Sequence, residues 1–221
     1  MSTSVAGKSF PMRRLPVVLM LDTSGSMRED DKIAVLNECL VEMIESLRIA
    51  DAGLGVIVLS IVTFGGDSAK VVFENCPVGD VKLLKLTAGG KTPMGSAFAL
   101  TQRLIEDYEA LPSNSYAPTI ALVSDGLPTD KGWQASLDAL IKSERGAKAS
   151  RFAVSIGADA DNVMLESFHP GGPRKAQDAS GIREFLRFVT MTIVDPTYVD
   201  SSYLSSEANL DGHSVQVNDD F

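Results

Sequence analysis

The feature that most limits what this chain can fold into is a series of short apolar runs separated by helix-like segments. Residues 15–21 and 119–124 are apolar almost without interruption, which is typical of strands buried on both faces of a sheet. Residues 56–64 are rich in β-branched side chains and predict another strand. Such strands in alternation with helices predict an α/β fold built on a parallel sheet.

Helical periodicity fills most of the intervals between these runs. The predicted helices span residues 31–49, 94–111, 133–143 and 182–194. A further strand is expected at residues 151–156, and residues 70–73 are expected to return antiparallel after a tight turn. We therefore predict a doubly wound, mostly parallel six-stranded sheet with one antiparallel edge strand and helices on both faces. Residues 160–181 give no clear pattern.

The composition of the chain divides it into three parts. Residues 13–194 are expected to form one α/β domain, and residues 1–12 are expected to be a flexible N-terminus. Residues 195–221 contain six acidic residues and no Lys or Arg, so they hold six of the nine net negative charges. This acidic tail is either a mobile solubilising segment or one that docks, through its tyrosines, on a partner or on its own domain.

Charge and cysteine content exclude several classes of protein. A net charge of −9 without clustered Lys and Arg argues against nucleic-acid binding. Cys39 and Cys76 are too few for a disulfide framework and are interpreted as reduced thiols, which suits the cytoplasm. No apolar stretch approaches the roughly 20 residues needed to span a bilayer. We expect a soluble, cytoplasmic protein without a membrane partner.

Five oxygen-bearing residues lie where they could meet at one edge of the predicted sheet. Asp22 and Asp125 each follow an apolar strand, and Ser24 and Ser26 follow Asp22 at alternate positions. Thr92 enters from a separate glycine-rich loop. An all-oxygen set suits Mg²⁺, or alternatively Mn²⁺ or Ca²⁺, in preference to zinc or copper. Since most of these ligands would be neutral hydroxyls, an acidic side chain of a partner protein is a natural further ligand.

These residues carry a resemblance to a known family. Asp22-Thr-Ser24-Gly-Ser26 matches the Asp-x-Ser-x-Ser motif of von Willebrand factor type A domains, and the loops around Thr92 and Asp125 match the second and third loops of their metal-ion-dependent adhesion site (MIDAS). The resemblance covers roughly residues 15–194. It implies that Ser24, Ser26 and Thr92 are direct metal ligands, and that Asp22 and Asp125 contact the ion directly or through water.

Within that superfamily the chain looks most like bacterial TerY-type proteins of tellurite-resistance and stress-response clusters. The runs that carry this likeness are residues 17–27 and Thr92-Pro-Met-Gly95. Such proteins are encoded beside a protein kinase and a phosphatase, which implies that this chain is a binding module that scaffolds a phosphorylation circuit and not an enzyme. The acidic tail has no counterpart in the resemblance.

The Gly90-Lys91-Thr92 string also resembles part of a phosphate-binding loop. That motif requires glycine five positions before Gly90, where Lys85 stands, and Pro93 removes a backbone N–H from a region where phosphate binding uses such donors. The sequence therefore argues against a nucleotide-binding site.

The sequence also bears on three kinds of hydrolase. A haloacid-dehalogenase phosphatase would need an aspartate where Ser24 stands, and a serine hydrolase would need a Gly-x-Ser-x-Gly elbow, which is absent. His169 is expected on the surface or in a loop. A metal-dependent hydrolase that uses the same ion to activate water stays open as the alternative, with Asp125, Asp67 or Asp130 as its general base.

Overall fold

A six-stranded sheet lies at the centre of the structure, a computed structural model that describes residues 12–195 except 55, 83–84, 158–161 and 170. The strands lie in the order β3-β2-β1-β4-β5-β6, and all neighbours are parallel except β2 and β3. Their bounds are β1 (Arg14–Asp22), β2 (Val56–Gly65), β3 (Ser68–Pro77), β4 (Thr119–Ser124), β5 (Ser150–Ile156) and β6 (Arg174–Ala176). The predicted fold class is confirmed.

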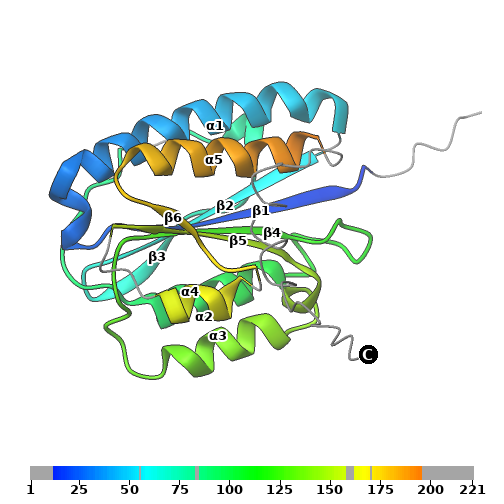
Figure 1. Cartoon of the computed structure of the whole chain (residues 1–221). Coiled ribbons are helices and arrows are strands. Elements are labelled where there is room, and N and C mark those ends of the chain that lie inside the picture. The colour runs from blue at the N-terminus through cyan, green and yellow to red at the C-terminus, as the bar shows by residue number, and fades with distance from the viewer. Residues whose placement is uncertain (1–11, 55, 83–84, 158–161, 170, 196–221) are drawn as a thin grey trace, which may run out of the picture.

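Helices cover both faces of this sheet. Helices α1 and α5 lie side by side on one face, and α2, α3 and α4 lie on the other (Figure 1). The helices are α1 (Lys32–Leu54), α2 (Met94–Ile105), α3 (Trp133–Lys142), α4 (Asn162–Phe168) and α5 (Ser180–Val194), with short 3-10 turns η1 (Gly25–Asp31), η2 (Val78–Asp80) and η3 (Gly146–Lys148).

The two helical layers explain why the central strands are apolar without alternation. In β1, Leu19 and Leu21 pack toward α1 and α5, whereas Val18 and Met20 pack toward α2 and α3. All four side chains are essentially inaccessible to solvent. Because successive side chains of a strand point to opposite faces, a strand covered on both faces must be apolar at every position.

Some element boundaries differ from the sequence prediction. Helix α2 ends at Ile105 and not at residue 111, because the Asp107 carboxylate accepts hydrogen bonds from the amides of Glu109 and Ala110 and closes a turn there. The antiparallel strand β3 spans ten residues instead of four. Helix α4 and strand β6 lie in the region that gave no pattern, since elements of seven and three residues are too short to show a period.

The strand order places a crevice between β1 and β4. Strand β1 leads through η1 to α1 on one face, and β4 leads to α3 on the opposite face, so the two loops diverge. Ligands of open α/β sheets bind at such a switch point, outside the carboxyl ends of the strands. Leu21 is in register with Val123, which puts Asp22 and the Ser124-Asp125 pair on either side of this crevice.

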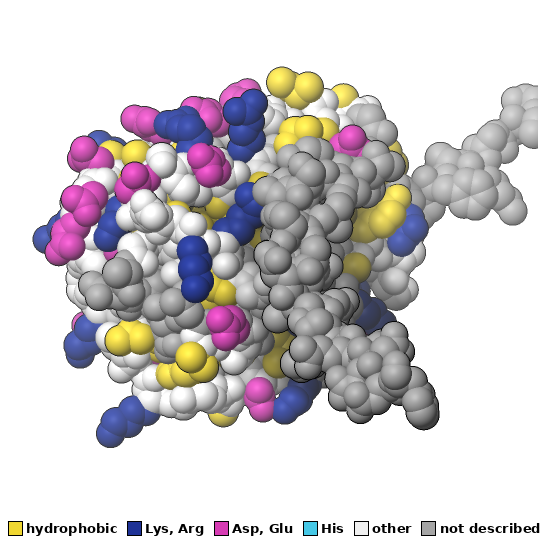
Figure 2. Space-filling view, viewed as in Figure 1, with side chains coloured by type: hydrophobic (Ala, Val, Ile, Leu, Met, Phe, Trp, Pro, Cys, Tyr) yellow, Lys and Arg dark blue, Asp and Glu magenta, His cyan; other side chains and the backbone are white. Residues whose placement is uncertain are grey.

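The surface outside the crevice carries charges of both signs. Acidic and basic side chains are interspersed over α1 (Figure 2), where Arg183 of α5 bonds Glu38 and Glu42. Within the described residues, no helix is long and apolar enough to span a membrane. The expected flexible N-terminus and acidic tail lie, apart from residues 12 and 195, outside the described residues.

Candidate metal centre

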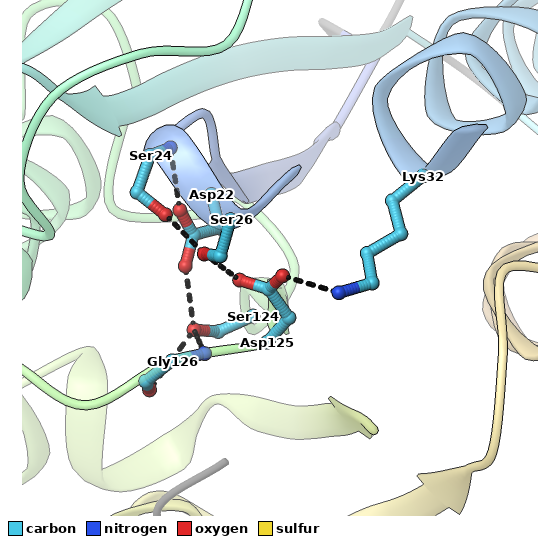
Figure 3. Close-up of polar contacts among 7 residues, drawn as sticks. All are labelled: Asp22, Ser24, Ser26, Lys32, Ser124, Asp125 and Gly126. Carbon is cyan, nitrogen blue, oxygen red and sulfur yellow. Dashed lines mark hydrogen bonds and ion pairs between the residues drawn. The ribbon is translucent and has the colours of Figure 1, made fainter. Parts of the chain in front are cut away.

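Asp22 is fully buried at the carboxyl end of β1. One carboxylate oxygen accepts a hydrogen bond from the Ser24 amide at 2.8 Å, and the other accepts one from the Ser124 hydroxyl at 2.7 Å (Figure 3). Burial raises the pKa of the Asp22 carboxyl to about 6, although the bonds from Ser24 and Ser124 act in the opposite direction. The Asp22 carboxylate thus fixes the first loop at a cost in desolvation.

A continuous chain of oxygen contacts extends from this loop to β4. The hydroxyls of Ser24 and Ser26 are 3.0 Å apart, and the Ser26 hydroxyl donates to Asp125 Oδ1 at 2.7 Å (Figure 3). Asp22, Ser24 and Asp125 are buried, whereas Ser26 is half-buried at the mouth of the crevice. Four of the five predicted site residues are therefore joined through hydrogen bonds.

Lys32 completes the surroundings of Asp125, and no pattern in the sequence pointed to it. It is the first residue of α1, and its ammonium lies 2.8 Å from Asp125 Oδ2. The Asp125 side chain is 0% exposed and the Lys32 side chain 11%. Both oxygens of Asp125 are therefore occupied, one by the Ser26 hydroxyl and the other by the Lys32 ammonium.

The glycine-rich loop brings Thr92 to the same edge of the sheet. A Cβ atom added at Gly126 would lie 3.7 Å from Thr92 Oγ1 and 4.0 Å from Ser26 Oγ, so both hydroxyls border the space beside Gly126. Gly90 has a φ of +79°, and a Cβ there would lie 2.4 Å from Gly66 Cα. Only glycine fits such a conformation and approach, and the bend at Gly90 therefore positions Thr92.

Three backbone amides of this loop, those of Gly89, Lys91 and Thr92, are bonded to the protein and not presented to a ligand. Gly89 donates to the Thr23 carbonyl at 2.8 Å, and Lys91 donates to the Gly66 carbonyl at 3.1 Å. The Thr92 amide donates to the Thr129 hydroxyl at 3.0 Å. A phosphate-binding loop uses such amides as donors, so these bonds agree with the rejection of a nucleotide site.

Thr129 and Asp130 join the second and third loops. The Thr129 amide donates to the Thr92 carbonyl at 2.9 Å, which makes the contact between these residues reciprocal. The Asp130 carboxylate accepts hydrogen bonds from the amides of Gly95 and Ser96 at the start of α2. Asp130 therefore positions the helix that follows Thr92. Asp67, by contrast, is almost fully exposed and lies 3.9 Å from the Lys91 ammonium.

The donor set fits a small hard cation. Mg²⁺ binds oxygen at about 2.0–2.1 Å in an octahedron, which separates adjacent ligand oxygens by about 2.9 Å. The contacts from Ser24 to Ser26 and from Ser26 to Asp125, at 3.0 and 2.7 Å, are close to that spacing. No three His, Cys, Asp or Glu side chains gather as a metal-binding group in the part of the chain that the structure describes. An ion here would use the serine and threonine hydroxyls.

His169 lies in the bend after α4, as one of the two expected placements had it, but not on the surface. His169 is buried, and its ring lies 5.9 Å from that of Phe152. Burial lowers the pKa of the His169 imidazole below its usual value. His169 follows α4 and does not belong to the site, and His213 lies outside the described residues.

Comparison with known proteins agrees with this architecture. A family model for the von Willebrand factor type A domain matches residues 17–127, which is half of the chain. The chain therefore belongs to the von Willebrand factor type A domain family. None of the curated proteins compared with the chain matches it.

Solved structures with the same fold come from several sources. One is proximal thread matrix protein 1 from the mussel byssus with a zinc-occupied MIDAS motif, which is 15% identical with a TM-score of 0.65 over 81% of this chain and 48% of that one. Another is a von Willebrand factor type A protein from Catenulispora acidiphila, which is 18% identical with a TM-score of 0.64 over 82% of this chain and 43% of that one. The pilus adhesin SpaC from Lactobacillus rhamnosus GG, in an open conformation, is 15% identical with a TM-score of 0.65 over 84% of this chain and 30% of that one. The chain spans less than half the length of each.

The raised pKa of Asp22 predicts a pH-dependent stability. The pKa is about 6 in the folded protein, whereas an aspartate free of the fold has a pKa of 3.8. Protonated Asp22 therefore contributes to the free energy of unfolding. This stabilisation is fully present below about pH 4 and is lost as the pH rises through 6. In EDTA, we expect wild type to lose up to about 3 kcal/mol of unfolding free energy between pH 4 and 7 relative to Asp22→Asn. Urea unfolding at a series of pH values measures this difference, and parallel pH profiles would contradict it.

The Asp130 carboxylate accepts two hydrogen bonds from backbone amides, and we therefore predict that it is needed for the stability of the fold. In Asp130→Asn, one amide of the α2 start would face an NH₂ group instead of an oxygen, so we expect a loss of about 1–3 kcal/mol in unfolding free energy. Asp138→Asn is the matched control, because Asp138 forms an exposed ion pair with Lys142. Equal unfolding free energies for the two variants would show that Asp130 does not have this role.

Proposed function

We propose that the chain is a protein-binding module that depends on a divalent ion. Ser24, Ser26 and Thr92 would be direct ligands, and Asp22 and Asp125 would contact the ion directly or through water. The ion supplies an electrophilic position that accepts a carboxylate from a partner protein. The observation that carries this proposal is the chain of hydrogen-bonded oxygens from Ser24 through Ser26 to Asp125, which gathers two hydroxyls and a carboxylate at separations of 3.0 and 2.7 Å. These hydrogen-bond distances are similar to the separation of adjacent ligands in an octahedron, so the same oxygens can surround an ion.

We propose Mg²⁺ as the ion, with Mn²⁺ or Ca²⁺ as alternatives. Carboxylate and hydroxyl oxygens are the ligands that these hard cations prefer. The mussel byssus protein with a zinc-occupied MIDAS motif makes Zn²⁺ a further ion to test. The similarity to a pilus adhesin supports a role in binding rather than catalysis.

The surroundings of the site favour an acidic partner on one side. A pocket of about 380 Å³ adjoins the first and second loops at Thr23 and Gly89, and among the described residues its charged lining consists of Lys70 and Lys85. The exposed Lys91 belongs to the second loop. Basic side chains in a pocket that adjoins the loops would attract an acidic segment and accelerate its association.

An approach over the end of η1 is less favourable to such a partner. Residues 29–31 of η1 are three exposed acids that directly precede Lys32. Leu127, next to Gly126, is 58% exposed and gives the third loop an apolar contact. We infer that a partner segment approaches over the second loop, with its carboxylate on the ion and its neighbouring acids near Lys70 and Lys85.

The finer identity of the system rests on the sequence resemblance. We propose that the module scaffolds a bacterial stress or tellurite-resistance complex with a protein kinase and a phosphatase, as the TerY-like runs suggest. We propose a cytoplasmic location, which suits the free thiols of Cys39 and Cys76.

The geometry favours a metal-dependent hydrolase less. A general base must reach the attacking water, but Asp125 is itself a proposed contact of the ion, and Asp22 is closed off from solvent. Asp130 is engaged by the start of α2. Turnover of p-nitrophenyl phosphate that requires Mg²⁺ and disappears in Asp125→Ala would restore this alternative.

The proposal predicts that hydroxyl ligands control metal affinity. In calorimetric titrations of the EDTA-treated protein, we expect Ser26→Ala and Thr92→Val to weaken Mg²⁺ binding by roughly tenfold or more, since the removed oxygens are inner ligands. Ser46→Ala is the matched control, because its hydroxyl bonds the Glu42 carbonyl on an exposed turn of α1. The same affinity in all four proteins, or no binding of Mg²⁺, Mn²⁺, Ca²⁺ or Zn²⁺ by wild type, would contradict the site assignment.

The basic pocket predicts a preference among ligands. On an array of peptides with one central Glu, we expect binding that requires Mg²⁺ and increases when the flanking residues are acidic. Reversal of charge in Lys70→Glu/Lys85→Glu should remove the preference for acidic flanks and leave the requirement for Mg²⁺. Lys142→Glu/Lys148→Glu, on the far side of the domain, is the control with the same net charge. An unchanged preference in the first double variant would exclude the pocket from recognition.

A further inference from the structure

The pair between Lys32 and Asp125 differs from other ion pairs in the structure. Its side chains are 11% and 0% exposed, whereas the side chains of Arg183 and Glu38, for example, are 41% and 65% exposed. An exposed pair contributes little because water screens it, but a buried carboxylate depends strongly on its counter-ion. The Lys32 ammonium is therefore the cation that Asp125 uses in this arrangement.

The position of the ammonium brings it into conflict with a divalent ion. Asp125 Oδ1 accepts from Ser26, itself a proposed ligand, and Asp125 Oδ2 accepts from Lys32. An ion bound through Ser26 and Asp125 would lie close to a fixed positive charge, and like charges in a partly buried site repel strongly. Of the two groups bonded to Asp125, the ammonium is the one whose place the ion can take.

We propose that Lys32 is a tethered cation that competes with the divalent ion for Asp125, and so raises the ion concentration at which the site fills. When the ion binds, Lys32 releases Asp125. This inference rests on the proposed function, because it assigns a regulatory residue to the same site. It also gives the start of α1 two arrangements, one bonded to the third loop through Lys32 and one not.

The backbone conformation just before Lys32 indicates that this turn is held in place by contacts and can relax when they are lost. Asp30 and Asp31 have φ values of +51° and +56°, in the left-handed region that non-glycine residues rarely adopt. Such conformations persist where surrounding contacts hold them. The bond from Lys32 to Asp125 is one such contact, and its release would allow the turn to relax. The exposed Asp30 and Asp31 carboxylates are also the nearest anions along the chain to a freed Lys32.

The test compares Mg²⁺ affinity in the full chain by calorimetry. We expect Lys32→Met to bind Mg²⁺ on the order of tenfold more tightly than wild type, because the competing charge is gone. Lys142→Met removes the same net charge from an exposed ion pair outside the site and is the matched control. It should stay within about twofold of wild type.

The outcomes separate competition from positioning. If Lys32 only orients Asp125, its loss should weaken Mg²⁺ binding by about 10- to 100-fold, as for other groups that orient a ligand. An Mg²⁺ affinity of Lys32→Met that is equal to or weaker than that of wild type overturns the competition but leaves the proposed function standing. If neither wild type nor Lys32→Met binds any of the four ions, both the inference and the proposed function fall.

A second measurement covers the case of an unstable variant. In EDTA, Lys32→Met should melt below wild type, because Asp125 loses its counter-ion, and saturating Mg²⁺ should raise its melting temperature more than that of wild type. Lys32→Gln provides a neutral side chain that still donates a hydrogen bond, and it should follow Lys32→Met. An Mg²⁺-induced rise no larger than that of wild type in both variants would overturn the competition.

Discussion

The burial of the Asp22 carboxylate is the constraint on which the rest of the site depends. Its two oxygens hold the amide that turns the first loop and the hydroxyl at the end of β4, so one side chain fixes the relative position of two diverging loops. The domain keeps this carboxyl where desolvation disfavours its charge. Ionisable groups whose charged form is destabilised by burial in this way are characteristic of functional sites, where a bound ligand can stabilise the charge.

Much of the fold followed from the sequence because the central strands are covered on both faces. Near-continuous apolar runs in β1 and β4 left no other place for these segments than the middle of a sheet. The prediction failed where local bonds override periodicity, as at Asp107, which ends α2 early. It also failed for α4 and β6, because these elements are held by their neighbours and have no pattern of their own.

The residues of the candidate site also fall into those that the sequence pointed to and those that it did not. Asp22 and Asp125 could be proposed as site residues because each stands at the end of a strand, and the topology alone brings such positions together. Lys32 and Thr129 were missed because their roles come from contacts across 93 and 37 positions of sequence. Nothing local distinguishes Lys32 from a surface lysine at the start of a helix. Its pairing with a buried carboxylate becomes visible only when the fold brings the start of α1 to the residue that follows β4.

The close approach of Gly90 to Gly66 separates the shape of the site from the chemistry of its rim. The loops are joined through backbone groups and through the side chains of Asp22, Thr129 and Asp130. The side chains of Lys91 and Leu127 face solvent and take no part in holding the proposed ligand hydroxyls. Residues on this rim can then be exchanged while the cradle beneath them is inherited unchanged. Such a scaffold could acquire new partners by substitutions at its rim alone, and the same property makes it suitable for grafting a chosen specificity.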